Sequence, residues 1–116
     1  MSTTSPSTDR AERRLADLRR FGAEAAFIVS HGFDAYAADS MEGALLRNAG
    51  EHVLLKVATV VEKLPQEYKE QFPDVDWVGI MRMRNLVAQH HDKVNDDLMF
   101  RALEVRIPGL LTALGP

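Results

Sequence analysis

The sequence contains no cysteine, and it has no long uninterrupted hydrophobic run. The absence of cysteine excludes disulfide scaffolds, thiolate-bound zinc sites and cysteine nucleophiles. Charged residues interrupt every apolar stretch, so no segment of about 20 apolar residues could span a membrane. The first residues lack the charged and then apolar layout of a secretory signal peptide. From these absences we expect a cytoplasmic protein without a membrane partner.

An excess of positive charge is also lacking. The 14 lysine and arginine residues stand against 17 aspartate and glutamate residues, which gives a formal net charge of −3. Proteins that coat nucleic acid non-specifically usually have a broad basic surface, so the composition does not favour that class. Two short basic segments remain, at residues 10–20 and 82–93, and they are compatible with a local anion site.

The sequence shows the periodicity of helices and no strand-like alternation. With 116 residues, of which 46% are hydrophobic, the chain has the length of one domain. We predict a disordered tail over residues 1–8 and a single helical domain over residues 9–116. Apolar residues spaced by three and four predict helices over about 8–30, 39–64, 75–91, 98–105 and 108–114. The predicted fold class is all-α, an antiparallel helical bundle of the four-helix type.

Three of the predicted helices begin at side chains that can cap free backbone N–H groups. Each helix start offers two candidates: Asp39 or Ser40, Asp74 or Asp76, and Asn95 or Asp96. The third predicted helix also has a wide apolar arc. The apolar residues of this arc do not fit one narrow stripe; they are Trp77, Ile80, Met83 and Val87. We therefore expect a dimer with this helix near the two-fold axis.

The residues best suited to chemistry gather between positions 82 and 93. They are Arg82, Arg84, Asn85, His90, His91 and Lys93. Arginine stays charged and grips phosphate with a planar fork, and histidine transfers protons near neutral pH. Together they can cleave RNA without a metal, since a base takes the ribose 2′-hydroxyl proton while arginine stabilises the phosphate oxygens. A structural interpretation competes with this one, because histidines favour helix C-termini and surface arginines form weak ion pairs.

Helical geometry ranks the two histidines. At about 100° per residue, His91 lies about 20° from the direction of Arg84 and about 10 Å further along the axis. His90 lies about 120° away from Arg84. His91 is therefore the better-placed partner of the arginine.

We expect neither a metal nor another cofactor. The carboxylates Asp92, Asp96 and Asp97 surround a predicted helix start, where acidic residues are more often caps than ligands. Two further histidines, His31 and His52, are isolated in the sequence, and we interpret both as structural.

A set of features between Gly32 and Leu111 occurs in an order that one family shares. They are Gly32-Phe33, Asp39 at a helix start, Gly50-Glu51, Pro73-Asp74-Val75-Asp76-Trp77, Ile80, Met83-Arg84-Asn85, the Val94/Asp96 region and Ile107-Pro108. In these features the chain resembles the HepT-like family of the HEPN superfamily. The most specific part is the proline-x-x-x-tryptophan step followed by Met-Arg-Asn.

The resemblance implies a function as well as an HEPN-like bundle. It implies a toxin-type, metal-independent RNA endonuclease that forms homodimers and pairs with a nucleotidyltransferase-type antitoxin. The superfamily motif is arginine, four to six residues, then histidine, and both His90 and His91 fit the interval from Arg84. Arg84 would then hold the scissile phosphate and a histidine would serve as base or acid. Asn85, Arg82 and Lys93 would position the RNA.

The end of the motif departs from the family pattern at two positions. The usual HepT-like ending, Arg-Asn-x-x-x-His-x-Tyr, places Gln89 at the histidine and His91 at the tyrosine. The amide of Gln89 does not titrate, so either a shifted histidine catalyses or this copy is inactive. The alternative to an RNA endonuclease is a non-catalytic HEPN binding module that partners a nucleotidyltransferase. A plain helical dimerisation domain is a third interpretation.

Overall fold

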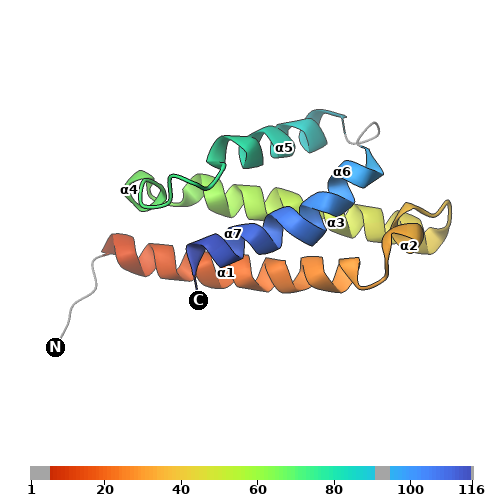
Figure 1. Cartoon of the computed structure of the whole chain (residues 1–116), viewed down its shortest axis with the longest axis horizontal. Helices are drawn as coiled ribbons and strands as arrows, with labels where there is room; N and C mark the ends of the chain where they lie inside the picture. The colour runs from red at the N-terminus through yellow and green to blue at the C-terminus, as the bar shows by residue number, and fades with distance from the viewer. Residues whose placement is uncertain (1–5, 91–94, 116) are drawn as a thin grey trace.

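The computed structural model describes residues 6–90 and 95–115, and in these two ranges the chain is all-helical with no strand (Figure 1). The helices are α1 (Pro6–Val29), α2 (Phe33–Ala37), α3 (Met41–Lys63), α4 (Gln66–Lys69), α5 (Trp77–His90), α6 (Asp96–Arg101) and α7 (Ile107–Leu114). A π-helical segment, η2 (Ala102–Arg106), joins α6 to α7. Among the described helices, none combines the length and the hydrophobicity that a membrane crossing needs.

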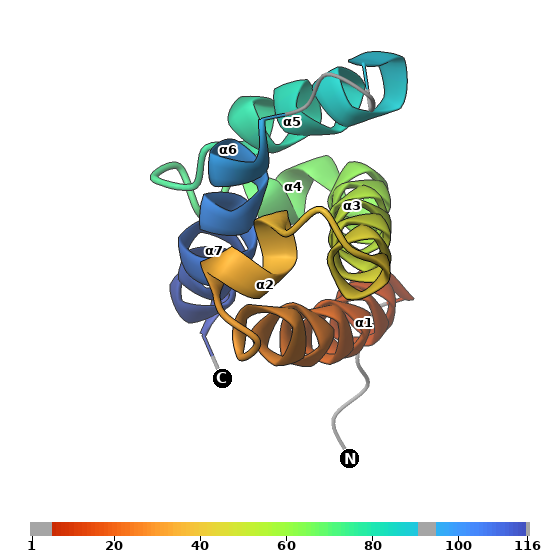
Figure 2. The same cartoon turned by 90° about the vertical axis from the view of Figure 1, so that its right-hand side faces the viewer.

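The two long helices, α1 and α3, lie side by side and run in opposite directions (Figure 1). The stretch formed by α6, η2 and α7 packs against α1, and α2 lies between its α6 end and α3. α5 packs against α3 and stands at one side of the molecule, away from α1 (Figure 2). The molecule measures 55 × 26 × 20 Å. The motif helix is thus an outer element of the fold.

One hydrophobic core joins α1, α2, α3, α5 and the α6–α7 stretch. Its largest fully buried side chains are Tyr36, Leu18, Met99, Leu103, Val57, Val61 and Val87. Burying a side chain of this size stabilises a fold by roughly 1.5–3 kcal/mol. The valines of α3 are poor intrinsic helix formers, so this burial supplies stability that their helix propensity does not.

The structure selects one cap from each pair that the sequence offers. The Ser40 hydroxyl accepts from the Gly43 N–H (3.0 Å) at the start of α3. The Asp76 carboxylate accepts from the Gly79 N–H (2.9 Å) at the start of α5. The Asn95 side chain accepts from the N–H groups of residues 97 and 98 (2.7 and 3.2 Å) at the start of α6.

Three element boundaries differ from the sequence-based expectation. α1 begins at Pro6, inside the range expected to be a disordered tail, because proline is well suited to a first helical turn; residues 1–5 lie outside the described ranges. The short α2 follows Gly32, where the sequence indicated only a helix end. Pro108 does not separate two helices, because the π-helical segment directly before it accommodates the missing N–H donor without ending the stretch.

Candidate functional site

Two side chains fix the start of α5, the helix that carries the motif. Asp76 caps it, as described above. The indole N–H of Trp77 reaches back and donates to the carbonyl oxygens of Lys69 and Phe72, each at 3.2 Å. These bonds tie the connection after α4 to the first turn of α5. The proline-to-tryptophan step of the sequence therefore has a local structural use, which is to set where the motif helix leaves the loop.

Met83 and Val87 orient α5 about its own axis. Both are buried, and they lie one turn apart on the side of α5 that joins the core. Arg84 follows Met83 and therefore emerges at the edge of this buried side rather than opposite to it. Its side chain is 29% exposed.

The guanidinium of Arg84 is held by two partners. It donates to the carboxylate of Glu62 near the C-terminal end of α3. It also donates to the side-chain oxygen of Asn85, from Nε at 3.4 Å and from Nη2 at 3.3 Å. Arg84 thus bridges α5 and α3, and its remaining N–H groups lie at a partly open surface. A charged planar fork in this position is suited to an anion, provided that the anion competes with Glu62.

The other predicted residues do not all join Arg84. Arg82 is exposed and leaves the helix about 200° away from Arg84, and exposed Gln89 lies about 140° away. His91 and Lys93 lie outside the described residues, as does the side chain of His90, whose backbone ends α5. Within the described ranges, the structure therefore brings together Arg84 and Asn85.

Two residues that the sequence did not associate with the motif stand beside it. The first is Glu62, which is 22 positions from Arg84 in the chain. The second is His52, which lines a groove between α3 and α5 together with Leu55, Val87 and Ala88. From the sequence, both residues are predicted only to lie in the helix that precedes the motif helix. The antiparallel packing of that helix against the motif helix is a tertiary property, which the sequence does not predict.

The α3–α5 groove begins about one helical turn beyond Arg84, which does not itself line it. Its cavity has a volume of about 310 Å³. Ala88 lies one turn beyond Arg84 on the same side of α5, and its small side chain leaves the groove open there. Glu62 and His52 are ten residues apart on α3, about 15 Å along the helix axis. A guanidinium at one end and an imidazole at the other can therefore contact separate points of an extended ligand.

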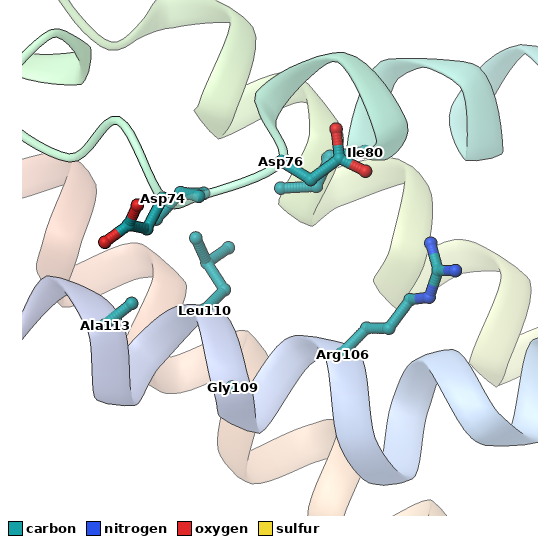
Figure 3. A pocket seen from close by; sticks show the side chains of 8 residues that line it. Asp74, Asp76, Ile80, Arg106, Gly109, Leu110 and Ala113 are labelled. Atoms are coloured by element: carbon teal, nitrogen blue, oxygen red, sulfur yellow. The ribbon is translucent and has the colours of Figure 1, made fainter.

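A second hollow lies between the start of α5 and α7 (Figure 3), with a volume of about 270 Å³. Asp74 and Asp76 form one wall and Arg106 reaches in from the opposite wall, over an apolar floor that includes Ile80 and Leu110. One oxygen of Asp76 is already engaged as the cap of α5. Of the residues predicted for RNA cleavage, none that the structure describes lines this hollow.

Among the residues that the structure describes, no cluster of three or more histidine, aspartate and glutamate side chains has the arrangement of a metal site. Comparisons with family models, with curated proteins and with solved structures give no match to this chain.

Proposed function

We propose that this protein is a HepT-like, metal-independent RNA endonuclease, the toxin of a toxin–antitoxin pair with a nucleotidyltransferase-type antitoxin. The observation that carries the proposal is the presentation of Arg84. Its guanidinium lies at the surface between α3 and α5, oriented by Glu62 and Asn85, in the sequence context Met-Arg-Asn. A partly exposed arginine with spare donors is suited to a phosphate diester.

The proposed reaction is a transesterification within the RNA chain. Arg84 binds the non-bridging oxygens of the scissile phosphate and stabilises the charge that develops on them. The ribose O2′ bonds to phosphorus as a base removes its proton, and the bond to O5′ breaks as an acid protonates that oxygen. His90 or His91 supplies these proton transfers. Asn85, Arg82 and Lys93 orient the RNA backbone.

The proposal includes an HEPN-like arrangement and a homodimer. In it, α1, α3, α5 and the α6–α7 stretch are the four helices of an antiparallel bundle. The outer place of α5 supports a dimer contact through this helix, since Val78 and Leu86 are both exposed large hydrophobic side chains on it. Two copies of Arg84 would then face a shared cleft, in which the RNA lies.

One residue favours a second candidate function, a non-catalytic module that binds the nucleotidyltransferase. Gln89 stands where the family pattern has its catalytic histidine, and an amide cannot transfer protons. In this alternative Arg84 and Glu62 form a structural ion pair, and any antitoxin acts on the protein by binding alone.

Cleavage of a generic RNA by the purified protein, with and without EDTA, tests the proposal. We expect cleavage in both conditions, with products that end in 2′,3′-cyclic phosphate. Arg84→Ala should abolish cleavage while circular dichroism stays unchanged, whereas the matched surface change Arg19→Ala should keep it. An inactive wild type would favour the binding module, and an active Arg84→Ala variant would remove the role assigned to Arg84.

A further inference from the structure

The outer side of the α1–α3 pair has an exposed apolar face, whose groove shares only His52 with the α3–α5 groove. Phe27 on α1 is 68% exposed, and Met41 and Leu45 on the first turns of α3 are 76% and 60% exposed. A groove of about 490 Å³ runs beside them, lined by Ala23 and Phe27 of α1 and by Ala49 and His52 of α3, among others. We call this surface the α1/α3 face. Exposed apolar groups gathered at a groove indicate an interaction surface.

Charged residues are placed symmetrically on the same side of α3. Glu42, Ala49 and Lys56 follow one another at intervals of seven residues, so they share one side of the helix within about 40°. Glu42 lies about 10 Å before Ala49 and Lys56 about 10 Å after it. Both charged residues are exposed, and the Lys56 ammonium stands 5.3 Å from the ring centroid of Phe21. On α3 the face therefore has an acidic residue at one end and a basic residue at the other, and Arg20 and Glu24 of α1 also line its groove.

Such a face is complementary to itself. A two-fold axis through Ala49 reverses the direction of α3, which brings Lys56 of one copy opposite Glu42 of the other, and the reverse. Leu45 precedes the axis by four residues, so in the second copy it lies opposite Val53, which lines the groove beside His52. The small side chain of Ala49 permits the close approach of two helices at the axis. Opposite charges at the ends fix the register of the contact.

We propose that a second copy of this chain docks on the α1/α3 face, about a two-fold axis at Ala49. Leu45 of each copy enters the groove of the other, and two Glu42–Lys56 ion pairs close the ends. This contact is separate from the α5 contact and does not depend on RNA cleavage.

The absence of cysteine makes the first test direct. In an Ala49→Cys variant the only thiol lies at the proposed axis, so mild oxidation should convert most of the protein to a disulfide-linked dimer. Thr59→Cys is the matched control, because it is exposed on the same helix but about 15 Å from the axis. Its two thiols would be about 30 Å apart in the dimer, whereas a disulfide needs Cα atoms within about 7 Å.

Charge reversal supplies the second test. Lys56→Glu and Glu42→Lys should each weaken self-association at least about tenfold in sedimentation equilibrium, and the double variant should restore it. Circular dichroism checks that each variant is folded. Equal cross-linking at positions 49 and 59, or a double variant no stronger than the singles, would overturn the proposal. So would a wild-type dimer that Ala49→Cys fails to link, since the contact would then lie on another face.

Discussion

At the scale of single residues, the ion pair between Arg84 and Glu62 decides how available the motif arginine is. The Glu62 side chain is 55% exposed, and exposed ion pairs contribute about 0–1 kcal/mol to stability. The pair is therefore a weak structural bond but an effective orienting contact. A phosphate that binds Arg84 has to compete with the Glu62 carboxylate for the same guanidinium.

This competition leads to a prediction for Glu62→Gln. Removing the negative charge should lower the KM for RNA by up to about fivefold, the equivalent of one exposed ion pair, with little change in the free energy of unfolding. Steady-state cleavage assays measure the effect, and Glu67→Gln on α4 is the matched control because it is also exposed. A higher KM in the Glu62→Gln variant would show that orientation of Arg84 outweighs the competition.

The buried side chain of Tyr36 makes the free energy of unfolding depend on pH. Burial, and then the charges of Asp96 and Glu51, raise the pKa of Tyr36 above its usual value near 10. As the pH rises past about 10, the unfolded chain loses this proton before the folded protein does, so stability falls. Below that pH the residue adds no pH dependence.

Replacement of Tyr36 by phenylalanine should therefore reduce the loss in the free energy of unfolding that occurs as the pH rises above about 10. Urea denaturation at pH 8 and pH 11 measures the difference in the free energy of unfolding. Burial also raises the pKa of Tyr68, but this side chain is only partly buried, so Tyr68→Phe should keep most of the alkaline loss. If Tyr36→Phe and wild type lose equal stability between the two pH values, Tyr36 does not cause the loss.

At the scale of elements, α5 depends strongly on the cap of its first turn. It packs mainly against one neighbour, α3, whereas α1 and α3 each pack against several elements. Asp76→Ala removes the cap and should cost about 1 kcal/mol in the free energy of unfolding. Asp74→Ala is the control, since Asp74 is exposed and caps nothing, and it should stay within about 0.5 kcal/mol. Equal losses in denaturant titrations would contradict the role of Asp76.

The C-terminal end of α5 bears on which histidine, His90 or His91, acts together with Arg84. The described helix reaches His90, one residue before His91. If the helical direction continues, His91→Ala should reduce RNA cleavage by about 10²–10⁴-fold and His90→Ala by less, because His91 shares the side of Arg84. Gln89→His should raise activity if the family register holds. Relative cleavage rates of the three variants measure the outcome, and a larger loss in His90→Ala would indicate a tightened last turn.

Local patterns predicted most of the elements but few of their partners. The spacing of apolar residues located α1, α3 and α5, and cap chemistry narrowed the starts of α3, α5 and α6 to two residues each. The sequence did not predict the five-residue α2, because a single helical turn is too short to show a periodicity of apolar residues. Arg84 and Asn85 were predicted to belong to one site because they are neighbours in the chain. Glu62 and His52 were not predicted to lie beside them, since only the antiparallel packing of α3 against α5 brings these two residues to the motif.

At the scale of the whole molecule, exposed apolar side chains lie on more than one side. Phe27, Met41 and Leu45 belong to the α1/α3 face, whereas Val78 and Leu86 lie on α5. Each face can serve a two-fold contact of its own. Two different two-fold contacts on one chain give a closed tetramer if their axes meet at right angles, and an open chain of subunits otherwise.

The two contacts should be separable by one substitution on α5. Leu86→Glu places a charge on a 36% exposed side chain of the motif helix. It should abolish both the proposed α5 contact and RNA cleavage, because the proposed cleft lies between two copies of Arg84. Disulfide formation in Ala49→Cys should persist in the same background. Val105→Glu on η2 is the matched control, being similarly exposed at 46% but away from both faces. Sedimentation velocity and RNA cleavage are measured together. A Leu86→Glu variant that keeps full cleavage as a smaller species would show that one copy of Arg84 suffices, and α5 would then be a substrate surface rather than a dimer contact.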